Sequence, residues 1–197
     1  MIRVGILGDI GSGKSFVAKN FGYPVFNADV EVAKLYKNSK KVFKELKKNL
    51  PDYFSTFPIK KHEVSKAILT DKRNLKKIIK IVHLEIRKKM NIFLNKNKNK
   101  KIVILDIPLL LENKINKKSD VLIFVDSIKM QVLKKLKKRK NFNKNIYYKF
   151  KKIQLPLDYK RKMSEFIIKN DFTNKKVLKY VRNIKIKLLN ERSGSRY

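Results

Sequence analysis

The stretch VGILGDIGSGKSFVAKNF, residues 4–21, predicts how the chain begins to fold. An apolar run of strand length leads into the glycine-rich turn GDIGSG, and the residues that follow have the apolar spacing of a helix. From Gly8 to Ser15 the sequence matches G-x-x-x-x-G-K-[ST], in the strand, turn and helix context that this pattern requires. The stretch therefore predicts a loop that binds the phosphates of a nucleoside triphosphate.

The residue types of this loop suit phosphate chemistry. Glycines let the backbone wrap so that successive N–H groups face an anion. Lys14 would reach the β- and γ-phosphates, and the hydroxyl of Ser15 would bind Mg²⁺, which neutralises charge as the phosphoryl group moves. The residues expected to hold ATP are Gly8, Gly11, Ser12, Gly13, Lys14, Ser15 and Phe16, with Ser15 also as metal ligand.

Strand-like and helical segments alternate along the chain. Helical spacing dominates residues 30–95, and further helical patterns separate the later apolar runs. This alternation predicts an α/β fold with a parallel sheet covered on both faces, and a helical insertion beside it. The apolar runs predicted as strands after the first are residues 23–29, 100–112, 120–126 and 165–171.

Two aspartates, Asp29 and Asp106, end apolar runs in this interpretation. The carboxyl ends of parallel strands meet at the ligand-binding edge of a sheet, so both carboxylates are expected near Lys14. A carboxylate at that place can hold Mg²⁺ or accept a proton from an attacking hydroxyl. The sequence pattern alone does not indicate which aspartate would hold Mg²⁺ and which would accept the proton.

Composition limits the classes of function. The 197 residues suffice for one compact core with a smaller subdomain, and the absence of cysteine excludes disulfides, thiolate zinc sites and a cysteine nucleophile. With neither a targeting segment nor a membrane-spanning apolar run in the sequence, we expect a cytoplasmic protein without membrane association. The net charge of +35 attracts polyanions, but the lysines are spread along the whole chain, which equally suits a compositional bias.

The motifs together resemble the dephospho-CoA kinase family over nearly the whole chain. GDIGSGKS resembles its phosphate loop, FNAD its strand ending in an Ala-Asp pair, and LDIPLLLE its Asp-x-Pro-Leu-Leu segment. The resemblance implies the P-loop NTPase fold, with a nucleotide-binding core in residues 1–29 and 101–197. It also implies a small helical lid at about residues 139–155 and a helical CoA-binding subdomain at 30–100. Further residues at matching positions are Arg139, Gln154, Lys160 and Asn170.

This resemblance implies a reaction and roles for residues. The reaction is ATP-dependent phosphorylation of the ribose 3′-hydroxyl of dephospho-CoA, the last step of coenzyme A synthesis, with Mg²⁺. Lys14, Asp29 and Arg139 would be catalytic, with Asp29 as general base and Arg139 over the ATP phosphates when the lid closes. The residues implied to bind the acceptor are Asp29, Lys61, His83, Arg87, Asp106 and Leu109.

Some positions depart from the family pattern. Leu84 replaces a proline after His83, and Lys61 and Lys135 stand where arginines are expected. Lysine keeps the charge but loses the bidentate geometry of arginine, so phosphate contacts there are expected to be looser. Asp9 and Ser164 also replace other residue types.

Two alternative functions fit parts of the sequence. A nucleoside or nucleotide kinase of the same architecture would share the phosphate loop and lid, but not LDIPLLLE. A nucleic-acid-binding protein with a phosphate loop would use the charge of +35. No localised basic patch or nucleic-acid motif is recognisable, so we expect ATP and dephospho-CoA as partners, no specific nucleic acid, and a monomer or small homo-oligomer.

Overall fold

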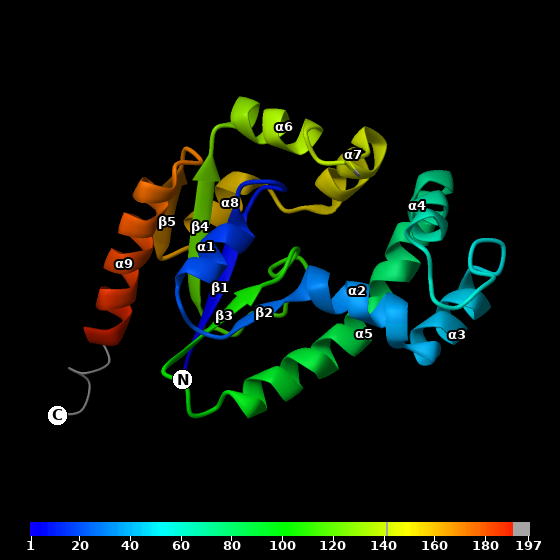
Figure 1. The fold of residues 1–197 in the computed structure, drawn as a ribbon, viewed down its shortest axis with the longest axis horizontal. Helices are drawn as coiled ribbons and strands as arrows, with labels where there is room; N and C mark the ends of the chain where they lie inside the picture. Colours follow the sequence, from blue (N-terminus) through cyan, green and yellow to red (C-terminus); the bar gives the residue numbers. More distant parts are fainter. Residues whose placement is uncertain (141, 191–197) are drawn as a thin grey trace. The chain divides into compact units, whose positions relative to one another are not determined.

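The computed structural model describes residues 1–140 and 142–190 and divides into two compact units (Figure 1). The core unit comprises Met1–Asn27, Asn97–Phe142 and Gln154–Tyr197. The helical unit comprises Ala28–Lys96 and Asn143–Ile153. Each unit is described by itself below.

The core unit contains a parallel sheet with strand order β2-β3-β1-β4-β5, which confirms the predicted α/β fold. β1 lies at the centre and is buried on both faces, as expected of an almost wholly apolar strand in a parallel sheet. All carboxyl ends therefore lie at one edge. The strands are β1 (Ile2–Gly8), β2 (Val25–Asn27), β3 (Ile102–Asp106), β4 (Val121–Ser127) and β5 (Phe166–Asn170).

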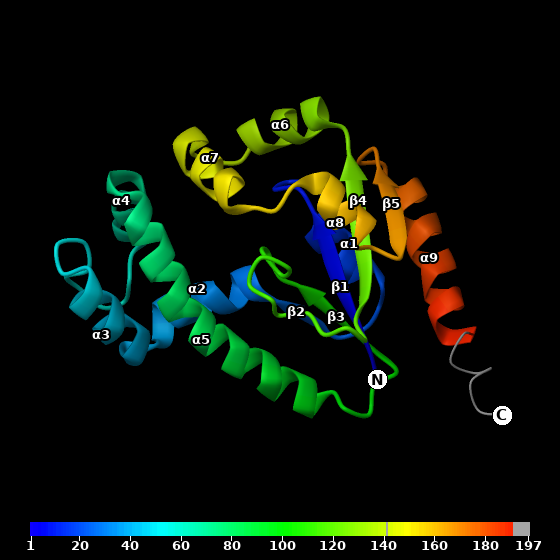
Figure 2. The ribbon, with the colours of Figure 1, turned by 180° about the vertical axis from the view of Figure 1, so that it is seen from behind.

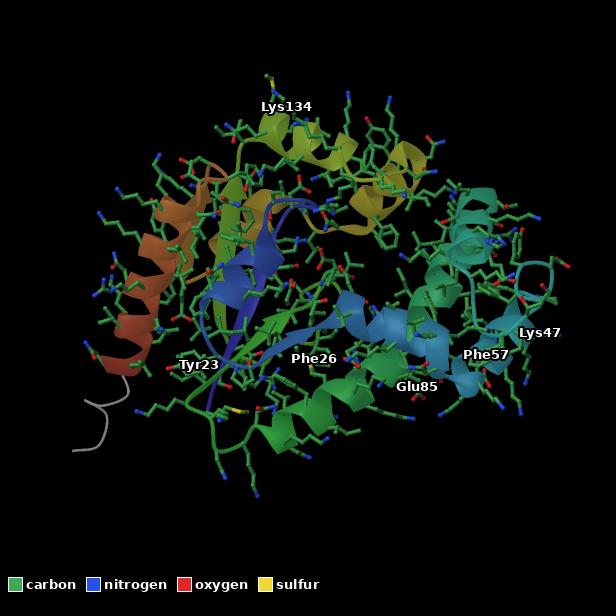
Figure 3. The ribbon with its side chains drawn as sticks, in the orientation of Figure 1. Tyr23, Phe26, Lys47, Phe57, Glu85 and Lys134 are labelled. Carbon is green, nitrogen blue, oxygen red and sulfur yellow. The ribbon has the colours of Figure 1, made fainter. Side chains whose placement is uncertain are left out.

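Helices cover both faces of this sheet. α1 (Lys14–Asn20) and α9 (Asn174–Asn190) enclose an apolar core on one face, in which Val17 and Val181 pack with strand residues. α8 (Leu157–Lys162) contacts β1 on the opposite face, as Figures 1 and 2 show. The remaining helix of this unit is α6 (Lys129–Lys137), which follows β4 and from which Lys134 projects into solvent (Figure 3).

β2 is shorter than the sequence pattern predicts. The strand was expected over residues 23–29, but it ends at Asn27, and Asp29 lies in the first turn of α2 (Ala28–Asn38), exposed to solvent. The prediction that Asp29 ends a strand is therefore wrong. Helical spacing begins here, since Ala28 and Leu35 are buried on one side of α2, and acidic residues in a first turn interact favourably with the helix dipole.

The helical unit is arranged around the long helix α5 (Lys72–Lys96), against which α2, α3 (Lys40–Asn49) and α4 (Lys61–Thr70) pack. Buried Leu75, Ile78, Val82, Ile86 and Met90 recur at three- and four-residue intervals along α5. Half-buried Glu85 of α5, labelled in Figure 3, accepts hydrogen bonds from Lys41 Nζ of α3 at 2.8 Å and from Lys88 Nζ at 3.1 Å.

The segment 139–155, expected as a lid, divides between the units. Residues up to Phe142 lie in the core unit, whereas α7 (Lys144–Ile153) lies in the helical unit and contacts α4. Lys149 Nζ donates to the carbonyl oxygens of Ile68 and Leu69 at 2.7 and 3.0 Å. A lysine suits this place, because the last carbonyls of a helix lack intrahelical partners and carry partial negative charge.

Across residues 1–140 and 142–190, none of the helices combines the length and the apolar character that crossing a membrane requires.

Candidate active site

The phosphate loop, residues 8–15, connects β1 to α1 and depends on its glycines. Gly8, Gly11 and Gly13 have φ of 143°, 82° and 94°, a region that residues with a Cβ rarely adopt. A Cβ on Gly13 would also overlap the side-chain amide of Asn170. The loop conformation thus requires glycine for its backbone angles and, at Gly13, for space.

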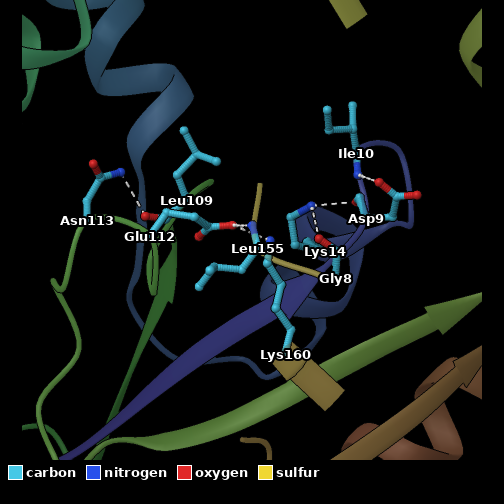
Figure 4. A network of polar contacts seen from close by, with 9 residues as sticks. All are labelled: Gly8, Asp9, Ile10, Lys14, Leu109, Glu112, Asn113, Leu155 and Lys160. Carbon is cyan, nitrogen blue, oxygen red and sulfur yellow. Dashed lines mark hydrogen bonds and ion pairs between the residues drawn. The ribbon is translucent and has the colours of Figure 1, made fainter. Parts of the chain in front are cut away.

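Lys14 lies over the loop with its ammonium group held by backbone oxygens. Its Nζ donates to Asp9 O at 2.7 Å and Gly8 O at 3.3 Å (Figure 4). Asp9, one of the departures from the family pattern, accepts a hydrogen bond from Ile10 N at 2.7 Å through Oδ1. The Asp9 carboxylate therefore stabilises the turn, and the Lys14 ammonium places a positive charge at the loop.

The other loop residues separate into buried and exposed ones. Ser12 is 1% exposed, and its carbonyl oxygen accepts hydrogen bonds from side chains at the ends of β4 and β5. Ser15 and Phe16 are exposed in the first turn of α1. The Ser15 hydroxyl is thus accessible to a ligand.

Asp106 is the last residue of β3, as expected of this aspartate, and is 3% exposed. The strand is nevertheless shorter than the predicted run of residues 100–112, because residues 107–112 lie outside it. Its Oδ2 accepts a hydrogen bond from Asn27 Nδ2 at 2.6 Å. Asn27 and Asp106 are partners in the β2–β3 register, so the sheet itself brings the amide beside the carboxylate. The amide orients the Asp106 carboxylate at the carboxyl edge of the sheet.

The segment after β3 is held by a buried ion pair. Lys160 Nζ lies 2.6 Å from Glu112 Oε1, which also accepts a hydrogen bond from Leu155 N at 3.0 Å (Figure 4). Their side chains are only 3% and 9% exposed. Through Glu112, the ion pair ties α8 to the segment 107–112, and the Leu155 bond ties the chain just before α8 to the same segment. Motifs from three parts of the sequence meet at one small cavity in the core unit. Residues that line this cavity include Gly8, Lys14, Leu109, Glu112, Gln154 and Lys160.

Leu109 contributes through its backbone. It is 7% exposed and has φ of 62°, a conformation in the left-handed region. Its carbonyl oxygen accepts hydrogen bonds from the side-chain and backbone nitrogens of Asn113, at 2.8 and 3.1 Å. The Asn113 bonds thereby stabilise the turn that follows β3.

Arg139 lines a second, open cavity of about 600 Å³ in the core unit. Lys135 Nζ lies 4.4 Å from the centre of the Phe172 ring on its wall, a cation–π contact. The Lys176 ammonium and the hydroxyl and amide of Thr173 hold the pKa of Asp171 below its usual range. Cations dominate the lining and suit a polyanionic ligand. The lining residues are Gln131, Lys134, Lys135, Lys138, Arg139, Asp171 and Phe172.

The remaining predicted residues, Asp29, Lys61, His83 and Arg87, lie in the helical unit. Lys61 is exposed at the start of α4. His83, half-buried, and Arg87, exposed, are four residues apart on α5, which places their side chains on one helix face. The structure thus groups a cation and an imidazole on α5.

Asn27 and Ser127 are site residues that the sequence patterns above do not single out. Each is the last residue of its strand, and each hydrogen-bonds a residue of the core unit at the carboxyl edge of the sheet. A polar residue at the end of each buried strand was the available signal, since parallel strands gather such residues at one edge.

Comparison with known families gives a match over most of the chain. The profile of a family described as dephospho-CoA kinase matches residues 2–176. A dephospho-CoA kinase of Wolbachia sp. subsp. Brugia malayi (strain TRS) is 35% identical over 186 residues, covering 92% of this chain and 95% of the relative.

Solved structures show the same fold. The protein TT1252 from Thermus thermophilus superposes with a TM-score of 0.78 at 25% identity, covering 95% of this chain and 97% of its own. Dephospho-CoA kinase from Campylobacter jejuni superposes with a TM-score of 0.62 at 19% identity, covering 94% and 96%.

The Glu112–Lys160 pair leads to a prediction about stability. Lys160→Met leaves the Glu112 carboxylate buried without its cation, and we expect the free energy of unfolding to fall by about 3–5 kcal/mol. Urea denaturation measures the change. Adding Glu112→Gln to this variant removes the uncompensated charge and should recover most of the loss. Lys162→Met, on the exposed side of α8, is the matched control; a loss as large in that control would contradict the assignment.

Proposed function

The chain belongs to the dephospho-CoA kinase family, and we propose that it transfers the γ-phosphoryl group of ATP to the ribose 3′-hydroxyl of dephospho-CoA, giving coenzyme A and ADP. The observation that carries this proposal is the family match over residues 2–176, together with a phosphate loop formed at the carboxyl end of the central strand. The nucleoside or nucleotide kinase alternative is not favoured, because the family match includes the segment 105–112.

We propose that the phosphate loop holds the phosphate chain of ATP through its backbone amides. The Lys14 ammonium, now bonded to Gly8 O and Asp9 O, has three N–H donors and would donate to the β- and γ-phosphates when ATP binds. This interaction strengthens as charge develops on the transferred group, so it lowers the barrier as well as binding ATP.

The side chains at this edge fit a Mg²⁺ ion, for which we propose Ser15 as a ligand. Mg²⁺ takes oxygen ligands and usually keeps few from the protein, the others being phosphates and water. The exposed Ser15 hydroxyl and the Asp106 carboxylate supply oxygen, and no cluster of three or more acidic, histidine or cysteine side chains occurs in the described residues. The ion would neutralise charge on the phosphates.

We propose Asp29 as the general base. The acceptor 3′-oxygen would form a bond to the γ-phosphorus as the bond to the β–γ bridging oxygen breaks, and ADP would leave with that electron pair. The proton of the 3′-hydroxyl would go to the Asp29 carboxylate. Its exposure at the start of α2 supports this role, because an exposed carboxylate is accessible to a substrate hydroxyl.

The cations of the helical unit suit the acceptor, whose phosphates are anionic. Lys61, His83 and Arg87 would bind those phosphates, and Asp106 and Leu109 would border the acceptor at the sheet edge. Arg139 would stabilise charge on the ATP phosphates from the wall of the 600 Å³ cavity.

We further propose a cytoplasmic enzyme that acts as a monomer or small homo-oligomer.

The acceptor assay tests the proposed function directly. Purified protein with ATP and Mg²⁺ is given dephospho-CoA, adenosine or AMP, and products are identified by mass, with fragment masses locating the new phosphate. We expect transfer to dephospho-CoA alone, at the 3′-position. Transfer to AMP or adenosine without transfer to dephospho-CoA would overturn the proposal.

The Lys14→Ala variant tests the loop. Because it removes a positive charge at the transferring group, kcat/KM should fall by about 10²–10³-fold or more. Lys19→Ala, exposed on the same helix, should retain normal kinetics. Equal rates for Lys14→Ala and Lys19→Ala would exclude the proposed role.

The Asp29→Asn variant tests the base. We expect kcat to fall by about 10²–10⁴-fold, because the amide cannot take the proton, with little change in the dissociation constant of ATP. Asp52→Asn makes the same chemical change at another exposed site of the helical unit and serves as control. A near-normal kcat for Asp29→Asn would show that another group accepts the proton.

A further inference from the structure

The carbonyl oxygen of Ser12 accepts two side-chain hydrogen bonds from the carboxyl ends of neighbouring strands. Asn170 Nδ2 donates at 2.7 Å and Ser127 Oγ at 2.9 Å. Ser127 and Asn170 are register partners and the last residues of β4 and β5, so the sheet places both donors side by side. We call Asn170 and Ser127 the donor pair.

The orientation of the Asn170 side chain follows from its other bond. Its Oδ1 accepts from Phe172 N at 2.8 Å, which leaves the Nδ2 end to face Ser12. Asn170 is 4% exposed, so water does not compete readily for these groups. The amide is thereby bonded at both ends and has one favourable orientation.

The bonds to the Ser12 carbonyl also determine where the next N–H points. In a planar trans peptide the C=O and N–H bonds are antiparallel. Because the donor pair holds the Ser12 oxygen toward the strand ends, the N–H of Gly13 is directed to the opposite side of the loop.

We propose that Asn170 and Ser127 are positioning residues that hold the Ser12–Gly13 peptide so that the Gly13 amide donates to the phosphate chain of the nucleotide. The inference rests on the proposed function, in that the bound anion is ATP or ADP. It assigns a role to two neutral side chains that need not touch the substrate.

A physical reason for such a pair lies in the glycine itself. Gly13 is required for its φ of 94°, yet glycine also permits many other backbone conformations. Rotation of the Ser12–Gly13 peptide would turn a carbonyl oxygen toward the phosphates and replace attraction by repulsion. Two hydrogen bonds to the Ser12 oxygen disfavour that rotation before the nucleotide arrives.

Asn170→Asp tests the role with little change in shape. The variant keeps the acceptor for Phe172 N, loses the Nδ2–H donor and adds a negative charge beside the loop, so calorimetry should show ADP binding weakened by about 10–100-fold. The neutral Ser127→Ala variant tests the hydrogen bond without that added charge. Binding of dephospho-CoA should not change. Ser127→Ala removes only one bond and should weaken ADP binding by a smaller factor, about 3–10-fold. Asn183→Asp, on the exposed side of α9, is the matched control.

An NMR measurement distinguishes loss of the Gly13 amide orientation from a general loss of structure. The chain has 6 glycines, and only Gly13 and Gly194 follow a serine, so ¹⁵N-glycine with ¹³C-carbonyl serine labelling selects two amide signals. ADP should move the Gly13 signal downfield in the unaltered chain and much less in Asn170→Asp. Equal shifts in both proteins would overturn the inference.

The binding results also distinguish this inference from the proposed function. If the unaltered chain phosphorylates dephospho-CoA but both variants bind ADP normally, the positioning role is wrong and the kinase function stands. Parallel loss of ADP and dephospho-CoA binding in Ser127→Ala would show a structural role only. If the unaltered chain binds neither ligand, both proposals fail.

Discussion

Parallel pairing about β1 is the constraint on which the rest of the core unit depends. Because β1 is buried on both faces along most of its length, the phosphate loop begins where the strand ends, at Gly8. The same pairing brings Asn27 beside Asp106 and Ser127 beside Asn170 at that edge. These polar contacts are consequences of strand register, and a one-residue slip in register would turn the side chains to the other face of the sheet.

The parts predicted from the sequence are those that local patterns determine. The loop at Gly8–Ser15 follows from glycine spacing, and the alternation of apolar runs with helical spacing predicts the parallel sheet. The end of β2 was placed two residues too late, because an apolar run that ends in a polar residue does not reveal whether the next turn is helical. In the structure the residues after Asn27 are helical, and Ala28 and Leu35 are buried on one side of α2.

The contacts that could not be predicted join residues far apart in the chain. Asn170 and Ser12 are separated by 158 residues, and Ser127 and Ser12 by 115. Motif resemblance marked Asn170 and Lys160 without indicating what either touches. Burial supplies that information: Lys160 at 2% exposure needs an anion, and Glu112 is the carboxylate within reach. The partner of a buried charge is determined by the tertiary structure, and the spacing of residues along the sequence does not reveal it.

The net charge of +35 does not by itself explain how the nucleotide site selects its ligand. Lysines spread along the whole sequence attract ATP, but they attract any polyanion equally, and their field is screened by salt. Selectivity for a phosphate chain must therefore come from groups with a defined direction, which a flexible ammonium on a four-carbon stem does not supply. Backbone amides in the loop do supply it, provided that their peptides are held. In this chain the residues that hold the Ser12–Gly13 peptide are neutral side chains at the strand ends, and hydrogen bonds and strand register determine their geometry.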